Sequence, residues 1–147
     1  MAYSILQVAK TLGELGGFSH SNLELQKMSY IAEMLHLGRT DGQPLIFQNF
    51  EAWDRGPVVP DLYQWAKMFG SSPVKNIFSR VNSIPQGDVA YDAVKDAYDM
   101  MHGKSPWQMV AITHRKGGAW DKFYEPGRKG IVIPKAAILD EYRTFAS

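Results

Sequence analysis

Apolar side chains recur at helical spacing in the first third of the chain, and short turn signals separate the groups. A first helix is predicted by residues that share one face at i, i+3, i+4 and i+7, namely Ile5, Val8, Ala9, Leu12 and Leu15. Gly16 and Gly17 are expected to end it. Ser21 and Glu24 form a capping box at the start of a second helix, whose apolar side chains cover almost its whole circumference. Such a helix is central in a fold or carries an interface on its second face, and we expect the central position.

The rest of the chain predicts four more helices and a little strand. Helical spacing recurs after Pro60, Asp88, Pro106 and Pro134, residues that suit a helix cap or first turn. Core-facing positions are expected at Leu62, Trp65, Ala66 and Phe69; Ala90, Val94, Ala97 and Met101; Trp107, Val110, Ala111 and His114; and Ile138, Tyr142 and Phe145. Short strands are expected at three places: 45–47, near 76–78, and 131–133. The pattern predicts a mainly α, compact single domain over residues 1–147, with about six helices and a minor two- or three-stranded β element.

The most distinctive segment spans residues 50–63 and reads Phe-Glu-Ala-Trp-Asp-Arg-Gly-Pro-Val-Val-Pro-Asp-Leu-Tyr. Gly56 can adopt a positive φ, and Pro57 fixes the backbone that leaves the turn. Pro60 suits the first turn of the helix that follows. The segment therefore predicts a short extended run, a rigid turn and a helix. By itself it indicates a structural element and no chemistry.

The composition is that of an ordinary globular protein. Of 147 residues, 45% are hydrophobic and 21% charged, which argues against disorder. No apolar run approaches the roughly 20 residues of a membrane span. The N-terminus lacks the features of a signal peptide, so we expect a cytoplasmic protein. The absence of cysteine excludes disulfides, thiolate zinc sites and a cysteine nucleophile.

Charge is unevenly distributed although the net charge is only +1. Residues 1–102 carry 8 Lys or Arg and 11 Asp or Glu, whereas residues 103–147 carry 8 and 4. This asymmetry is compatible with an electrostatically steered partner. The isoelectric point of 7.9 lies below the value of about 9 that is typical of nucleic-acid-binding domains.

Sequence motifs for catalysis are largely absent. There is no P-loop, no Gly-x-Gly-x-x-Gly run and no nucleophile elbow. The four histidines are not spaced as metal ligands, so neither a metal site nor a cofactor is predicted. Asp54 and Arg55 are compatible with a general acid beside a charge clamp, but we favour an ion pair at the end of a helix. His114 could act as a general base oriented by Asp121, but a structural histidine is favoured because no nucleophile is in sight.

Cations and aromatic residues alternate between residues 114 and 124, and two glycines interrupt them. One interpretation is a surface that binds a phosphate or an acidic protein, with Trp120 or Tyr124 as an anchor. The other is a helix end whose basic residues offset the macrodipole, with Trp120 and Phe123 buried, and we favour burial for Trp120. The candidate partner-binding cations here and at the turn are Arg55, Arg115, Lys116, Lys122, Arg128 and Lys129. Nucleic-acid contact is disfavoured because no stacking platform is predicted.

Three groups of residues resemble the signature of the Panacea (SocA-like antitoxin) domain family. The Phe-x-Ala-Trp run followed by Gly-Pro-Val is the most specific, the Leu-x-Lys-x-x-Tyr helix is the second, and a His followed by a Trp is the third. In this chain the matching residues are Leu25, Lys27 and Tyr30; Ala52, Trp53, Gly56, Pro57 and Val58; and His114 and Trp120. The resemblance extends from about Leu23 to Tyr142, and we expect these residues to maintain the scaffold.

The resemblance implies a non-enzymatic domain that neutralises a cognate protein toxin by direct complex formation in a bacterial or prophage toxin–antitoxin system. An alternative is a phage or mobile-element interaction protein, or a proteolytic adaptor, that acts on a host protein. An enzyme and a nucleic-acid binder are weaker alternatives. No membrane partner is expected, and homo-oligomerisation stays open.

Overall fold

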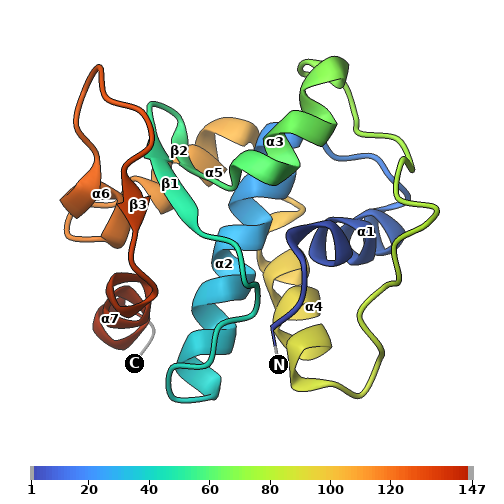
Figure 1. The fold of residues 1–147 in the computed structure, drawn as a ribbon, viewed down its shortest axis with the longest axis horizontal. Coiled ribbons are helices and arrows are strands. Elements are labelled where there is room, and N and C mark those ends of the chain that lie inside the picture. Colours follow the sequence, from blue (N-terminus) through green and yellow to red (C-terminus); the bar gives the residue numbers. More distant parts are fainter. Residues whose placement is uncertain (1, 146–147) are drawn as a thin grey trace.

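The computed structural model describes residues 2–145. Of these residues 53% are helical, and seven α-helices accompany a small three-stranded antiparallel sheet, which confirms the predicted mainly α fold (Figure 1). The helices are α1 (Ile5–Gly16), α2 (Asn22–Arg39), α3 (Pro60–Ala66), α4 (Val89–Met101), α5 (Pro106–Thr113), α6 (Ala119–Phe123) and α7 (Lys135–Phe145), with a 3₁₀ turn at Lys67–Phe69. The strands are β1 (Phe50–Trp53), β2 (Gly56–Val58) and β3 (Val132–Ile133).

Helix α2 is the centre of the fold, as its apolar circumference predicts. The capping box is present: Glu24 N donates to Ser21 Oγ, and Ser21 N donates to the Glu24 carboxylate. Five other helices and strand β2 contact α2. In Figure 1 the sheet, α6 and α7 lie on one side of it, and α1 and α4 lie on the other. Anything attached to α2 is therefore fixed relative to the whole domain.

The sheet has the order β2-β1-β3, and both pairs are antiparallel. Alternation along β1 turns Phe50 and Ala52 inward, where both are fully buried, and the Phe50 ring meets the edge of Tyr30 on α2 at 5.3 Å between centroids. Glu51 and Trp53 alternate with them and are only partly buried. The sheet thus packs the Phe50 and Ala52 side of β1 on α2, whereas Glu51 and Trp53 on the other side are less deeply buried.

Two of the three predicted strands are absent. At 45–47 only Ile46 forms an isolated bridge, with Tyr3, and residues 76–78 have no regular structure. Phe78 is nevertheless buried and stacks on Trp65, so its side chain anchors this segment to the core without a ladder of backbone hydrogen bonds.

Several predicted helix faces need correction. Trp107 is 83% exposed, because α5 buries Met109 and Thr113 instead. Trp65 is 41% exposed, since α3 ends in a 3₁₀ turn. Phe145 is also 41% exposed and lies under the Arg115 guanidinium. The short helix α6 was not predicted. Trp107, Trp65 and Phe145 therefore lie at the rim of the core.

Candidate functional site

The signature lysine is buried and connects α2 to strand β2. Lys27 on α2 is 1% exposed, and its Nζ donates to the Pro57 carbonyl at 3.1 Å. Burial lowers the pKa of Lys27 from 10.5 to about 7. A Cβ on Gly56 would lie 2.9 Å from Lys27 Nζ, and Gly56 has a φ of +116°. A glycine at this turn is therefore needed for its backbone conformation and for the close approach of the amine.

The signature tyrosine belongs to a second buried network. Tyr30 donates from its hydroxyl to Glu141 Oε1 at 2.5 Å, and the Ala119 backbone N donates to the same oxygen at 3.0 Å. Arg115 Nε donates to Glu141 Oε2 at 2.8 Å. Gly118 leaves room for the carboxylate, because a Cβ there would lie 2.9 Å from Glu141 Oε2. Glu141, which is 2% exposed, therefore joins α2, α7 and the start of α6.

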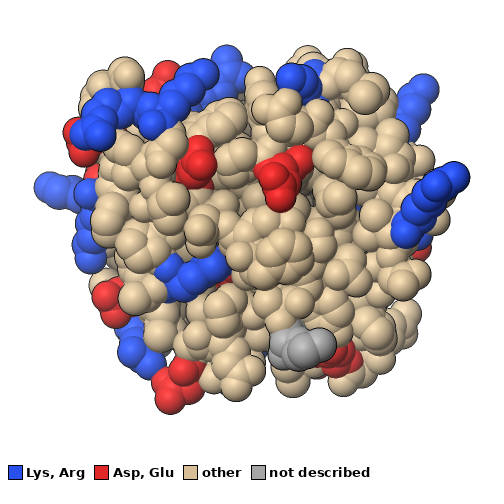
Figure 2. Space-filling model, viewed as in Figure 1, with Lys and Arg blue, Asp and Glu red and all other residues tan. Residues whose placement is uncertain are grey.

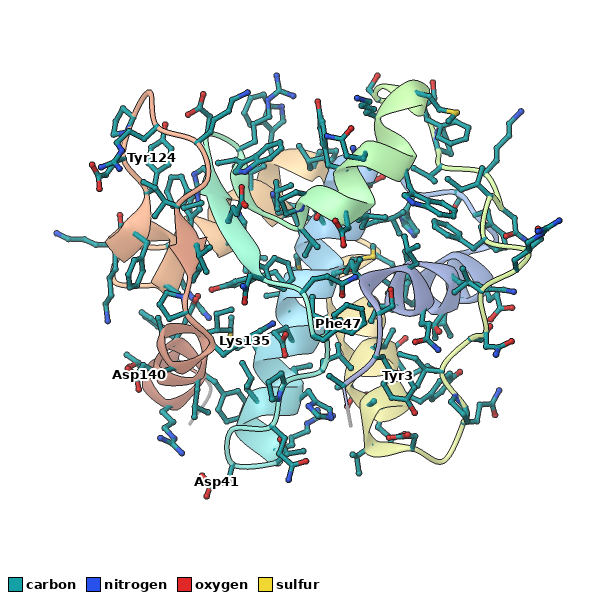
Figure 3. The ribbon with its side chains drawn as sticks, viewed as in Figure 1. Tyr3, Asp41, Phe47, Tyr124, Lys135 and Asp140 are labelled. Atoms are coloured by element: carbon teal, nitrogen blue, oxygen red, sulfur yellow. The ribbon has the colours of Figure 1, made fainter. Side chains whose placement is uncertain are left out.

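Two further polar contacts hold the core segments to α2. Gln26 forms a pair of hydrogen bonds with the backbone of Val59, at 2.9 and 3.3 Å. Glu33 is fully buried and accepts from Leu45 N at 2.6 Å and from Lys135, which reaches from the start of α7 toward α2 (Figure 3). The sequence analysis did not single out Gln26, Glu33 or Lys135. The available signal was the spacing of Lys27, Tyr30 and Glu33 at intervals of three, which places polar groups on one side of a buried helix.

Trp120 is buried, as expected, and is bonded to the signature turn. Its Nε1 donates to the Trp53 carbonyl at 2.7 Å. Its ring lies between those of His114 and Tyr124, with centroid distances of 3.6 and 4.5 Å. The Tyr124 hydroxyl donates to Asp54 Oδ1, and Figure 3 shows Tyr124 above α6. This stack therefore holds the β1–β2 turn, to which Lys27 is also bonded.

The geometry gives little support to the catalytic roles that the sequence left open for Asp54 and His114. Asp54 is bonded to Tyr124 and not, as expected, to Arg55. Asp121 accepts from Gly117 N and does not form a hydrogen bond with His114. Burial lowers the pKa of His114, opposed by the Arg55 backbone, and Lys27 adds to the lowering. His114 Nε2 is buried without a hydrogen-bond partner within residues 2–145. His114 is therefore part of an aromatic stack, with a pKa below its usual value.

The candidate partner-binding cations separate into two kinds. Arg115 is anchored to Glu141 and to the Phe145 ring, so part of its role is structural. The others are exposed: Arg55, Lys116, Lys122, Arg128 and Lys129. Figure 2 shows Lys and Arg side chains gathered at the end of the molecule where Figure 1 places α6 and the β1–β2 turn. This end carries the positive charge that the sequence assigned to its C-terminal third.

The described residues offer little that could hold a metal or a cofactor. Between residues 2 and 145, no group of three or more His, Asp or Glu side chains converges on a point. An open hollow of about 420 Å³ lies beside Tyr3 and Asp88, and one of about 290 Å³ lies beside Glu51 and Asp61. None of the helices in this range combines the length and hydrophobicity that a bilayer span requires.

The other scaffold residues of the signature are all buried: Leu25, Ala52, Pro57 and Val58. Comparison with known proteins gives the family that the sequence resemblance indicates. The model of the family described as "Antitoxin SocA-like, Panacea domain" matches residues 25–121. Antitoxin SocA of Caulobacter vibrioides is 32% identical over 136 residues, which cover 84% of this chain and 72% of that protein. No solved structure matches. The chain belongs to the SocA-like Panacea antitoxin domain family.

Proposed function

We propose that this domain neutralises a cognate protein toxin by binding it directly, without catalysis. The observation that carries the proposal is the family match over residues 25–121, together with a relative named as an antitoxin. The proposal places this binding in the cytoplasm, and the partner is a protein toxin encoded beside this chain.

The internal polar networks support a binding role over an enzymatic one. Lys27, Tyr30, Glu33 and Glu141 are among the buried titratable groups, and each forms a hydrogen bond with another part of the same chain. Their function in this arrangement is to hold the sheet, α6 and α7 on α2. Catalytic groups need a reachable reacting atom and a partner that orients them. A rigid scaffold that leaves its exterior free for contact is what toxin neutralisation requires.

The exposed cations are the proposed partner-binding residues. Arg55, Lys116 and Lys122 lie in or beside segments that the two networks hold in place, and Arg128 and Lys129 lie in the loop between α6 and β3. Fixed segments lose little conformational freedom on binding, which favours affinity. A standard interface buries about 800 Å² on each partner, which a domain of this size can supply.

Co-expression tests the proposal. Each reading frame adjacent to this chain's gene is expressed alone and together with the chain. We expect one product to arrest growth alone, to permit growth in the presence of this chain, and to co-elute with it in size-exclusion chromatography with light scattering. That measurement also gives the oligomeric state of each species.

Two controls distinguish binding from catalysis, and inhibition in a stable complex from delivery to a protease. A His114→Gln/Asp121→Asn variant with an unchanged melting temperature should still neutralise, because no chemistry is assigned to those groups. Toxin abundance distinguishes inhibition in a stable complex from delivery to a protease: it is maintained in the first case and falls in the second. Growth arrest that persists for every adjacent product, with no complex formed, would contradict the proposal.

A further inference from the structure

The side chain of Phe47 is exposed although the backbone that carries it is firmly held. Phe47 is 66% exposed, whereas its neighbour Ile46 is 1% exposed. Phe47 N donates to the Tyr3 carbonyl at 3.0 Å, and the Gln48 carbonyl accepts from Lys135 Nζ at 2.7 Å. Figure 3 shows Phe47 near the middle of the viewed face, between Lys135 and Tyr3. The domain therefore presents this aromatic ring to solvent from a fixed position.

The residues on either side of Phe47 line the two open hollows described above. Tyr3, which is bonded to Phe47, lines the hollow of about 420 Å³ together with Val89. Gln48 lines the hollow of about 290 Å³ together with Val132. Val89 is 58% exposed and Val132 is 43% exposed. Single exposed apolar residues are normal on a surface, but this group of three beside two hollows indicates an interaction site, which we call the Phe47 face.

Three carboxylates of the Phe47 face keep their negative charge. Asp88 lines the larger hollow, and Glu51 and Asp61 line the smaller one. Their hydrogen-bond donors are uncharged, namely a tyrosine hydroxyl, a backbone N–H, a side-chain amide and an indole. Among residues 2–145, no Lys or Arg side chain lines either hollow, and none forms an ion pair with these carboxylates. The hydrogen bond from the Tyr3 hydroxyl lowers the pKa of Asp88, so this group is ionised at neutral pH.

Two cations lie near the Phe47 face, and one of them is already paired. Lys135 donates to the buried carboxylate of Glu33. Lys129 Nζ lies 5.7 Å from the centroid of the Trp53 ring and forms no ion pair with Glu51. Figure 2 shows most Lys and Arg side chains around the edge of this view. Because the three carboxylates are opposed by a single unpaired cation, the Phe47 face is acidic.

The smaller hollow has the chemistry of a site for a long cationic side chain. Pro60 and Val132 contribute apolar groups to its lining, and Glu51 and Asp61 contribute carboxylates. Lys and Arg carry a charged end group on an apolar stem, so both parts of such a side chain would find matching groups there. Aromatic residues are enriched in protein interfaces, which suits Phe47 beside this hollow. The surface therefore matches a protein that is both basic and partly apolar.

We propose that the toxin docks on the Phe47 face through a basic surface, with Phe47 as the apolar anchor and a Lys or Arg side chain of the toxin in the hollow between Glu51 and Asp61. This deepens the proposed function and rests on it. The exposed cations proposed above as partner-binding residues gather at the end of the molecule that carries α6. Two contact regions of opposite charge favour a single orientation of the bound toxin.

The experiment measures the dissociation constant of the toxin identified by co-expression, by calorimetry at about 0.05 and 0.5 M salt. We expect Phe47→Ala to weaken binding at least about tenfold with an unchanged melting temperature, because the ring is mostly exposed. Glu51→Gln/Asp61→Asn keeps the hydrogen-bond acceptors and removes both charges. It should weaken binding at least about fivefold at low salt and less at high salt.

Matched controls change the same kinds of group elsewhere on the surface. Trp107→Ala removes an aromatic residue that is 83% exposed, and Asp99→Asn/Asp140→Asn neutralises two exposed carboxylates of α4 and α7. Both controls should bind the toxin within about twofold of the unmodified chain.

Each outcome supports or overturns the proposal. If Phe47→Ala and Glu51→Gln/Asp61→Asn both bind and neutralise like the controls, the docking surface is overturned and the antitoxin function stands. A loss confined to Phe47→Ala overturns the basic chemistry of the toxin surface, and a loss confined to the charge variant overturns the anchor. Self-association of the chain that Phe47→Ala abolishes would show that a second copy covers this face instead. Failure of the unmodified chain to bind any adjacent product overturns both proposals.

Discussion

The buried amine of Lys27 should make the stability of this domain depend on pH. In the folded state its pKa is lowered from 10.5 to about 7 by burial, and no carboxylate compensates it. In the unfolded chain the same amine keeps its proton up to a pH of about 10. Between pH 7 and 10 the unfolded state therefore binds more protons, and the free energy of unfolding rises with pH.

The size of the effect follows from the two pKa values. A difference of one bound proton changes the free energy of unfolding by about 1.4 kcal/mol per pH unit. Near pH 7 the folded amine is half-protonated, which halves the slope there, so the rise from pH 7 to 9 amounts to about 2 kcal/mol. Below pH 7 the amine is charged in both states, and this contribution to the slope vanishes.

Two other titrating groups, His114 and Tyr30, limit the pH range in which the effect of Lys27 can be measured alone. Burial lowers the pKa of His114 below 6.5, so its contribution also rises with pH but is complete near neutrality. The pKa of Tyr30 is raised well above 10.0, first by burial and then by Glu141, so the folded state keeps a proton that the unfolded state loses. Stability should therefore fall above a pH of about 10. Measurements between pH 7 and 9 isolate Lys27.

Urea unfolding at pH 7, 8 and 9 provides the assay. Lys27→Met keeps most of the apolar stem and removes the titrating group, so its unfolding free energy should lose the rise of about 2 kcal/mol. Lys75→Met, at an exposed position, should retain it. A Lys27→Met variant with the same slope as the unmodified chain would refute the reasoning.

Three further substitutions test the packing, with unfolding free energies measured in the same assay. Glu141→Ala should lose about 3 kcal/mol, because the Tyr30 hydroxyl and a backbone N–H lose their buried acceptor; a change below about 1 kcal/mol would show that water replaces the carboxylate. Gly56→Ala should lose about 1–3 kcal/mol, since φ is +116° there; a neutral result would mean that the turn relaxes. Phe50→Ala should cost about 3–5 kcal/mol and Trp107→Ala less than about 0.5, because their rings are 0% and 83% exposed; similar losses at both positions would contradict the assigned burial.

Helix starts and the turn at Gly56 were predicted well, because the residues that determine them lie close together in the sequence. The caps at Ser21, Asp88 and Ser105 are present as hydrogen bonds to nearby backbone N–H groups. The turn at Gly56 and the helix after Pro60 also follow the prediction. Each of these features depends on contacts within a few residues, which a sequence pattern displays directly.

The faces of the short helices were less predictable. Helix α5 has eight residues, and helical spacing allows either Trp107 or Met109 to face the core. The choice depends on which side chain fits against α2, and Met109 is the one that is fully buried. Likewise, the sequence alone does not show that Phe50 is fully buried against α2 while Trp53, a scaffold residue by the family signature, is partly buried beside Tyr63.

The order of residues along the chain was enough to determine a helical single domain built on its second helix, and to indicate its family. Those properties arise from periodicity, caps and a contiguous motif. Only the tertiary structure decided what the motif does: it brings Glu141 to Tyr30 across 111 positions and the Pro57 carbonyl to Lys27 across 30. Partners so distant in sequence leave no periodic trace, because burial decides which polar groups must meet.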